Sequence, residues 1–228
     1  MRDAARGISG EYYIERDDGI INSHPVTDYN IPLLDWDEPE RLGIQHTKGR
    51  VLDIGCGAGR VALYLQNQGF DVIGIDSAPG AIEACKTKGL QKAHVMPVEE
   101  LDFPDNFFDT VIMYGNNFGI PGNESNIIEM LEKLYKFTTV EGIIIAGSAD
   151  VEKTTEQVHI DYHRRNLERD RPKGLLRLRV KYKDTIGEWS DLYLASPKEM
   201  KSMSEKAGWK LSRIYERGGQ FVGILTKS

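Results

Sequence analysis

The segment VLDIGCGAGR (residues 51–60) decides the fold of this chain, because an apolar strand runs directly into a glycine-rich turn. A helix-like stretch, residues 61–68, follows the turn and stops at Gly69. A strand, a glycine turn and a helix in this order bring backbone N–H groups close to a bound ligand. The turn reads GxGxG, whereas the dinucleotide fingerprint GxGxxG needs a glycine where Arg60 stands. The segment therefore predicts an α/β ligand site that departs from the dinucleotide pattern.

An acidic residue, Asp76, supports the same interpretation. It follows the next predicted strand, residues 71–75, about 20 residues after the turn, where a carboxylate can accept both hydroxyls of a ribose. The alternative is an ordinary strand–helix turn followed by an acidic residue that has no such role.

Strands and helices alternate along the rest of the chain. Helices are expected at 79–86, around Ile127, Leu131 and Leu134, and at 198–207, and further strands at 94–97, 108–114, 143–146, 209–215 and 220–226. This alternation implies a mostly parallel sheet covered on both faces. The four residues 216–219 are too few for anything but an antiparallel connection. We therefore expect an α/β, Rossmann-like, doubly wound sheet of seven strands with an antiparallel last strand.

Two segments lie outside this alternation. Residues 1–49 are polar and punctuated by prolines, and we expect a leader or cap with little regular structure. Residues 150–196 are expected to be an insertion, with a helix at 156–169 and a β-hairpin formed by 176–183 and 189–195. Strict alternation of apolar and basic residues in 176–183 predicts one dry and one wet face. The main domain is then 50–228, with the insertion as its lid.

The composition excludes several classes of protein. The 228 residues carry 29 Lys and Arg against 35 Asp and Glu, a net charge of −6, which disfavours general nucleic-acid binding. No stretch approaches the ~18 apolar residues of a membrane span, and residues 1–15 lack the apolar run of a signal peptide. Two cysteines, Cys56 and Cys85, are too few for a disulfide framework or a zinc cluster. A cytoplasmic enzyme or binding module is the expectation.

Three segments of the sequence resemble the class I S-adenosylmethionine-dependent methyltransferases. VLDIGCGAGR (51–60) is similar to the first motif of that family, VIGIDSAPGAIEACK (72–86) to its second and FDTVIMYGNN (108–117) to its fourth. An antiparallel last strand is also characteristic of the family. The resemblance covers residues 50–228 apart from the insertion, and it implies that S-adenosyl-L-methionine (SAM) is the cofactor.

The resemblance also implies roles for individual residues. Gly55, Cys56 and Gly57 would lie against the methionine part of SAM, Asp53 would hold its amino group through the local backbone or a water, and Asp76 would bind the ribose. The other implied cofactor contacts are Ser77 beside the adenine, the backbone of Val98, the side chain of Glu99, and Tyr114. For Glu99, a solvated surface charge is the alternative.

The segment after the fourth expected strand concerns the methyl acceptor. The string Gly-Asn-x-Phe at residues 115–118 is similar to one in glycine N-methyltransferase and related small-molecule enzymes, which implies that Asn116 faces the acceptor. The alternative is that Asn116 and Asn117 only close a turn. The element typical of enzymes that methylate nucleobase or glutamine amide nitrogens is missing from this sequence, so we expect a small molecule with an N or O nucleophile.

An acceptor that carries a proton needs a general base. The candidates are His24, His159, His163 and the tyrosines Tyr12, Tyr13 and Tyr29, and for each of them an ordinary structural role is the alternative. The segment HIDYH (159–163) lacks the glutamate of the metalloprotease motif, so we expect no metal site. The candidate catalytic residues are His24, Asn116 and His163.

The insertion is locally basic, with ten Lys and Arg against six Asp and Glu in residues 151–184. This excess favours either an anionic acceptor or a solvated strand face. Three other functions stay open: a SAM-binding regulatory or partner subunit without catalysis, a protein or RNA methyltransferase, which the acidic charge disfavours, and a nicotinamide-dependent oxidoreductase. Arg60 and the antiparallel last strand count against the oxidoreductase. The expected partner is a small-molecule substrate, with no nucleic acid and no membrane.

Overall fold

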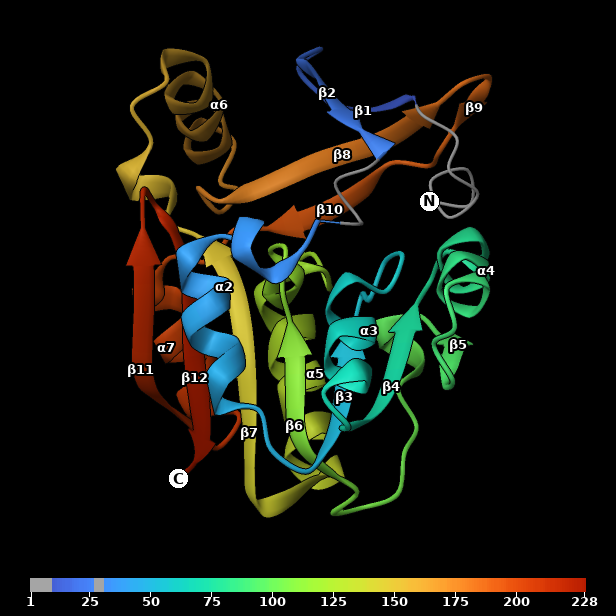
Figure 1. Cartoon of the computed structure of the whole chain (residues 1–228). Coiled ribbons are helices and arrows are strands. Elements are labelled where there is room, and N and C mark those ends of the chain that lie inside the picture. The colour runs from blue at the N-terminus through green and yellow to red at the C-terminus, as the bar shows by residue number, and fades with distance from the viewer. Residues whose placement is uncertain (1–9, 27–30) are drawn as a thin grey trace.

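The computed structural model describes residues 10–26 and 31–228, which form two sheets (Figure 1). Among these residues the larger sheet has seven strands in the order β11-β12-β7-β6-β3-β4-β5. The strands are β3 (Arg50–Ile54), β4 (Asp71–Asp76), β5 (Ala93–Val95), β6 (Phe108–Met113), β7 (Thr138–Ala149), β11 (Trp209–Arg217) and β12 (Gln220–Lys227). Strand β12 is antiparallel to both of its neighbours, and the other pairs are parallel. The expected α/β doubly wound sheet with an antiparallel last strand is confirmed.

Helices cover both faces of the larger sheet (Figure 1). One face carries α2 (Glu38–Gly43), α3 (Arg60–Asn67) and α4 (Pro79–Thr87), and the other carries α5 (Glu124–Phe137) and α7 (Pro197–Lys206). Short 3-10 helices are η2 (Leu33–Asp35), η3 (Ile44–His46), η4 (Val98–Glu100), η5 (Asn117–Gly119) and η6 (Val151–Lys153). Helix α7 begins with a capping box between Ser196 and Glu199, a sequence signal that fixes where a helix starts.

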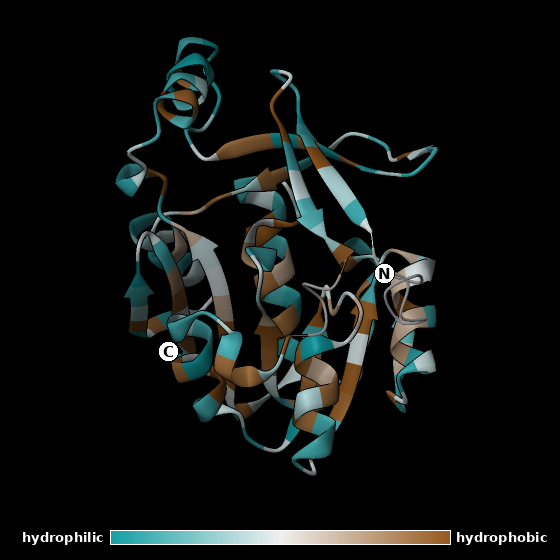
Figure 2. Ribbon diagram, turned by 45° about the horizontal axis from the view of Figure 1, so that its top comes forward, coloured by the Kyte–Doolittle hydropathy of each residue, from teal (hydrophilic) through white to brown (hydrophobic). Residues whose placement is uncertain are grey.

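The core occupies both faces of the larger sheet. Neighbouring residues of a strand point to opposite faces, and in β3 Val51 packs toward α3 while Leu52 packs toward α5. Both side chains are buried, as expected for a parallel strand covered on two sides. Hydrophobic residues gather along these strands, whereas the helix of the insertion, α6 (Gln157–Glu168), is mainly hydrophilic (Figure 2).

The smaller sheet lies over the carboxyl ends of the parallel strands (Figure 1). Its order is β10-β8-β1-β2, with β9 also paired to β8. These strands are β1 (Glu11–Arg16), β2 (Ile21–Pro25), β8 (Leu175–Tyr182), β9 (Thr185–Ile186) and β10 (Ser190–Tyr193). The antiparallel hairpin expected in the insertion is confirmed by the pairing of β8 with β10. We call this second sheet the cover sheet.

The expectation that residues 1–49 have little regular structure is wrong. Strand β1 pairs with β2 and also with β8, so the leader supplies two of the five strands of the cover sheet. The prolines do not interfere, because Pro25 ends an edge strand and Pro39 lies in the first turn of α2, where a missing N–H costs nothing. The leader and the insertion, expected as separate segments, therefore form one sheet.

Apolar and basic residues alternate in β8 and lie on opposite faces of the strand, and basic residues form ion pairs. The register places Ile14 opposite Val180 and Glu15 opposite Arg179. The Glu15 carboxylate pairs with both Arg179 and Lys181, and these contacts hold its pKa down to about 2. Val180, on the apolar face, is 51% exposed. The prediction of one dry and one wet face is therefore wrong here, because ion pairs cover the basic face and the apolar face borders a cavity.

Candidate functional site

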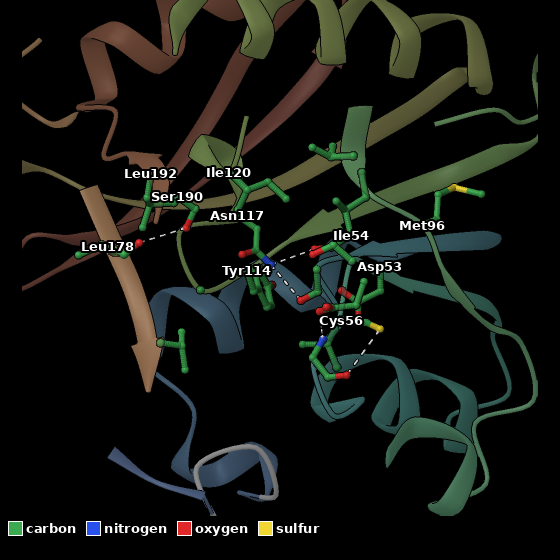
Figure 3. A pocket seen from close by; sticks show the side chains of 18 of the residues that line it. Asp53, Ile54, Cys56, Met96, Tyr114, Asn117, Ile120, Leu178, Ser190 and Leu192 are labelled. Carbon is green, nitrogen blue, oxygen red and sulfur yellow. Dashed lines mark hydrogen bonds between the residues drawn. The ribbon is translucent and has the colours of Figure 1, made fainter. Parts of the chain in front are cut away.

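A cavity of about 580 Å³ lies between the carboxyl ends of β3, β4 and β6 and the cover sheet. All nine residues that the sequence implies as cofactor contacts line this cavity: Asp53, Gly55, Cys56, Gly57, Asp76, Ser77, Val98, Glu99 and Tyr114. They come from the lower wall, which the larger sheet provides. Residues of β1, β8 and β10 form the upper wall. The structure thus brings the expected residues together on one side of a single cavity (Figure 3).

The glycine turn at 55–59 is held open by its backbone conformation and by one side chain. Gly55, Gly57 and Gly59 have φ of 68°, 56° and 84°, a region that favours glycine. The side-chain amide of Asn117 donates hydrogen bonds to the carbonyl oxygens of Ile54, at 2.9 Å, and of Gly55, at 3.0 Å (Figure 3). The turn therefore has a fixed shape, and its exposed side faces the cavity.

Asp76 ties the second strand to the glycine turn. One carboxylate oxygen accepts a hydrogen bond from the N–H of Gly57 at 3.0 Å, and the other accepts from the N–H of Ala78 at 2.8 Å. Burial raises the pKa of Asp76, and these two backbone bonds act against that rise. A carboxylate has lone pairs beyond these two bonds, so Asp76 can still accept from a ligand hydroxyl.

Asp53 is the most enclosed acidic group of the site. Its residue is only 2% exposed, and burial raises the pKa of its carboxyl to about 7, although the nearby charge of Arg60 acts in the opposite direction. Its Oδ2 atom is buried and makes no hydrogen bond to any described residue. A buried oxygen without a partner is costly, so this atom is suited to receive a donor from a ligand.

Arg60, which replaces the third glycine of the dinucleotide pattern, connects the site to the leader. Its guanidinium forms a two-pronged ion pair with Glu40 at 2.7 and 2.9 Å and lies 4.4 Å from the ring centre of Trp36. The hydroxyl of Tyr114 donates to the carbonyl oxygen of Glu40 at 2.9 Å. Glu40 and Trp36 could not be identified from the sequence. Arg60 at a position where glycine is expected indicates that its charge needs a partner, but it does not show which residue that partner is.

The two cysteines lie beside each other behind the turn. Their sulfur atoms are 3.9 Å apart, and Cys85 Sγ donates to the carbonyl oxygen of Gly57 at 3.2 Å. The contact with Cys85 and burial both raise the pKa of the Cys56 thiol, which keeps it in the unreactive protonated form. Cys56 is thus a small packing residue of the turn.

The structure does not bring the three candidate catalytic residues to the cavity wall. Asn116 has the left-handed conformation, with φ of 69°, that starts η5, and its Oδ1 is buried without a described partner. The next residue, Asn117, lines the cavity instead. His24 stacks on Tyr12 with ring centres 5.2 Å apart, and His163 is buried in the insertion, where its Nδ1 donates to the carbonyl oxygen of Lys173 at 2.8 Å. The three candidates are therefore not among the described residues that line the cavity.

The other candidate bases also have structural partners. His159 Nδ1 accepts from Arg16 at 2.9 Å, and Tyr13 donates to Glu11 at 3.2 Å. Tyr29 lies outside the described residues. Within residues 10–26 and 31–228, no group of three or more His, Cys, Asp or Glu side chains is arranged to hold a metal ion. The same part of the chain has no helix with both the length and the apolar character needed to cross a membrane.

The basic residues of the insertion are mostly neutralised. Ion pairs with carboxylates involve Lys153, Arg164, Arg165, Arg171, Lys173, Arg177, Arg179 and Lys181. This arrangement favours the surface interpretation of the basic residues over a site for an anionic acceptor.

Comparisons with known proteins decide the family. Residues 51–142 match the family model described as a methyltransferase domain. Residues 51–142 of this chain form a methyltransferase domain. The methyltransferase domain begins in β3, the strand that precedes the glycine turn, and it includes the whole lower wall of the cavity. The nicotinamide-dependent alternative is therefore set aside.

Individual relatives of the methyltransferase domain are distant. A SAM-dependent methyltransferase from Bacteroides fragilis, solved in complex with S-adenosyl-L-homocysteine, has the same fold, with a TM-score of 0.84 and 22% identity over 100% of this chain and 92% of that one. A glycine/sarcosine N-methyltransferase of Parasynechococcus marenigrum is 25% identical over 54% of this chain and 49% of its own length. A ubiquinone biosynthesis O-methyltransferase of Rickettsia conorii is 36% identical over 33% and 27%. The chain spans less than half the length of the curated relatives it matches.

Proposed function

We propose that this chain transfers a methyl group from SAM to a small-molecule acceptor with an N or O nucleophile. The observation that carries the proposal is the buried Oδ2 of Asp53, which has no described partner and borders a cavity formed by the methyltransferase domain. SAM has an ammonium group on its methionine part, and a partner of this kind satisfies a buried carboxylate oxygen.

The other residues of the lower wall fit the remaining parts of SAM. Asp76 offers acceptor sites for the ribose hydroxyls. Gly57 has a positive φ that favours glycine, and because glycine has no side chain, the turn leaves room where the cofactor would lie. Val98 is buried and Glu99 is exposed, so these two residues would border the adenine from the inside and from the rim.

Bound SAM supplies a sulfonium methyl that is already a strong electrophile. The protein then has to hold the acceptor in line with that methyl and exclude water, and positioning of this kind accounts for much of the rate. The cover sheet suits the second task, because Ile14, Leu178 and Leu192 face the cavity from above. We accordingly propose that residues 50–228 form the catalytic domain and that the insertion, together with β1 and β2, is its lid.

No histidine is among the described residues that line the cavity, so none of the described histidines is placed to remove a proton from the acceptor. This favours an acceptor that is nucleophilic before it binds, or one that loses its proton to water. The relatives whose names state the acceptor atom include both an N- and an O-methyltransferase, so they support either kind of nucleophile.

Calorimetry tests the proposal directly. SAM and S-adenosyl-L-homocysteine should each bind with one site per chain, NADH should not bind, and Asp53→Asn should weaken SAM at least tenfold. A screen with SAM labelled in its methyl group then measures transfer to small amines and hydroxylated compounds. Binding of SAM without transfer to any acceptor would support the alternative of a regulatory subunit, and a failure to bind SAM would refute both.

A further inference from the structure

The upper wall of the cavity has a different character from the lower wall. The apolar side chains that line the cavity from above are those of Ile14, Leu178, Val180 and Leu192, and Ile120 joins them from the loop after η5. We call these five residues the apolar wall. Ser190, opposite Leu178, also lines this wall, and its hydroxyl donates to the carbonyl oxygen of Leu178. In the close view, Leu178, Leu192 and Ile120 lie on one side of the cavity and Asp53, Cys56 and Met96 on the other (Figure 3).

The apolar wall is a continuous surface. Val180 is directly opposite Ile14, and Leu192 is opposite Leu176, so residues from three neighbouring strands share one face of the cover sheet. Val180 is 51% exposed although it lies inside the sheet rather than at a loop tip. An apolar patch left open beside a polar cofactor site is typical of a surface that binds a ligand.

The charges around the cavity exclude an anionic ligand at this wall. Two basic residues line the described part of the cavity, Arg60 and Arg179. Arg60 is paired with Glu40, and Arg179 shares the Glu15 carboxylate with Lys181 on the opposite face of the cover sheet from Val180. Asp191, which also borders the cavity, lies 3.6 Å from Arg177. A carboxylate or phosphate placed here would find no unpaired cation, and an unpaired buried charge is strongly unfavourable.

We propose that the methyl acceptor is a largely apolar small molecule without a negative charge, held between the apolar wall and the cofactor. This inference rests on the proposed function and narrows it. The apolar part of the acceptor packs against Leu178, Val180 and Leu192, which leaves its N or O atom directed at the lower wall. The acceptor thereby lacks the carboxylate of an amino acid such as glycine, the substrate named for one of the relatives.

The first experiment uses N-phenyl-1-naphthylamine, an uncharged apolar dye whose fluorescence rises on binding. We titrate it into the protein saturated with S-adenosyl-L-homocysteine and displace it with 1-naphthol, which is uncharged at pH 7, or with 1-naphthoate, which is anionic. We expect 1-naphthol to displace the dye at a concentration at least tenfold lower than 1-naphthoate. Equal or better displacement by 1-naphthoate overturns the inference.

The second experiment compares two matched variants of the cover sheet. Val180→Glu places a charge on the apolar wall, whereas Ile186→Glu places the same charge on the other face, since Ile186 is opposite Lys181 and is 58% exposed. Val180→Glu should weaken dye binding at least tenfold and Ile186→Glu less than twofold. S-Adenosyl-L-homocysteine should bind within threefold of the unmodified protein in both variants.

The outcomes separate this inference from the proposed function. If both variants weaken the dye equally, or neither does, the apolar wall is not the acceptor surface even though the cofactor binds. If Val180→Glu converts a dimer into a monomer on size-exclusion chromatography, a second copy covers the wall and the inference is wrong. If the unmodified protein does not bind S-adenosyl-L-homocysteine, the proposed function fails, while the dye titration without it still tests the apolar wall.

Discussion

The side-chain nitrogen of Asn117 lies 3.0 Å from the carbonyl oxygen of Gly55, and a Cβ added to Gly55 would approach that nitrogen to 2.4 Å. The amide and the turn therefore fit each other only when residue 55 has no side chain. The asparagine acts on the cofactor site through the backbone, because its amide is occupied by the carbonyl oxygens of Ile54 and Gly55.

Asn117→Ala should loosen the turn and weaken SAM binding. Two hydrogen bonds are lost, and at roughly 1 kcal/mol each they correspond to a decrease in affinity of about 30-fold at most. Calorimetry with SAM measures the change. The neighbouring variant Asn116→Gly is the control, because Asn116 does not line the cavity and glycine accepts its positive φ. The control should stay within threefold, and an equal loss in both variants would contradict the role of Asn117.

SAM affinity should rise with pH through the range in which Asp53 titrates. The pKa of this carboxyl is raised to about 7 in the cavity, so below pH 7 much of the protein holds Asp53 neutral and unable to attract an ammonium group. The free energy of SAM binding should therefore be less favourable at pH 6 than at pH 7.5. Binding should also release protons, which calorimetry in buffers of different ionisation enthalpy detects. Asp53→Asn should remove this dependence between pH 6 and 7.5. A profile that is equally steep in the variant would assign the titration to another group.

The same carboxyl should make the ligand-free protein less stable as pH rises. Its pKa is about 7 when folded and near the ordinary 3.8 when unfolded, so between these values the folded state binds more protons. The contribution of Asp53 to the free energy of unfolding is therefore most favourable at low pH, and it falls as the pH rises toward 7. Urea titrations should show that Asp53→Asn is more stable than the unmodified protein at pH 8, by an amount of the order of a few kcal/mol. The difference should be smaller at pH 5 and should vanish only below the ordinary pKa of 3.8. The reverse order at pH 8 would disprove the burial argument.

The pair of Arg60 and Glu40 should anchor the leader helix α2 to the site. Both side chains are mostly buried, and breaking a buried ion pair leaves an uncompensated charge. Arg60→Met and Glu40→Gln should each lower the free energy of unfolding by about 2 kcal/mol. The double variant should lose less than the sum, with a coupling of at least about 1 kcal/mol. Strict additivity would show that the pair does not contribute.

Ligand binding should slow hydrogen exchange in specific parts of the cover sheet. The residues that line the cavity from above belong to β1, β8 and β10, whereas α6 contributes none of those described. Exchange at 11–16, 175–182 and 190–193 should slow when S-adenosyl-L-homocysteine and an acceptor are both bound, with 157–168 unchanged. Protection confined to the glycine turn would show that the cover sheet does not close over the ligand.

The lower wall of the cavity could be predicted from the sequence because its signals are local. The glycine turn directly follows β3, Asp53 and Asp76 lie near the carboxyl ends of β3 and β4, and all nine implied residues line one cavity. The side-chain direction at Asn116 and Asn117 could not be predicted, because one left-handed residue in the turn decides which of two adjacent asparagines faces the site. The pattern in the sequence was the same for both.

The cover sheet shows a second kind of limit. The alternating pattern of residues 175–182 predicted a strand. The pattern did not show which distant strand pairs with its open edge. The polar leader strand Glu11–Arg16 gave no hydrophobic signal of its own and pairs through its backbone. The Arg60–Glu40 pair was hidden for the same reason, since many carboxylates in this acidic chain could have been the partner.

The pairing of β1 with β8 also has a consequence for how the molecule is made. Glu15 and Arg179 are 164 residues apart, so during synthesis at roughly 5–20 residues per second β1 emerges on the order of ten seconds before its partner. The contact is among the most non-local in the chain, and contacts of this kind form late because the intervening chain must first be ordered. In that interval β3 to β7 leave the ribosome. The nascent methyltransferase domain therefore exposes its glycine turn to the cellular solution before the cover sheet can form.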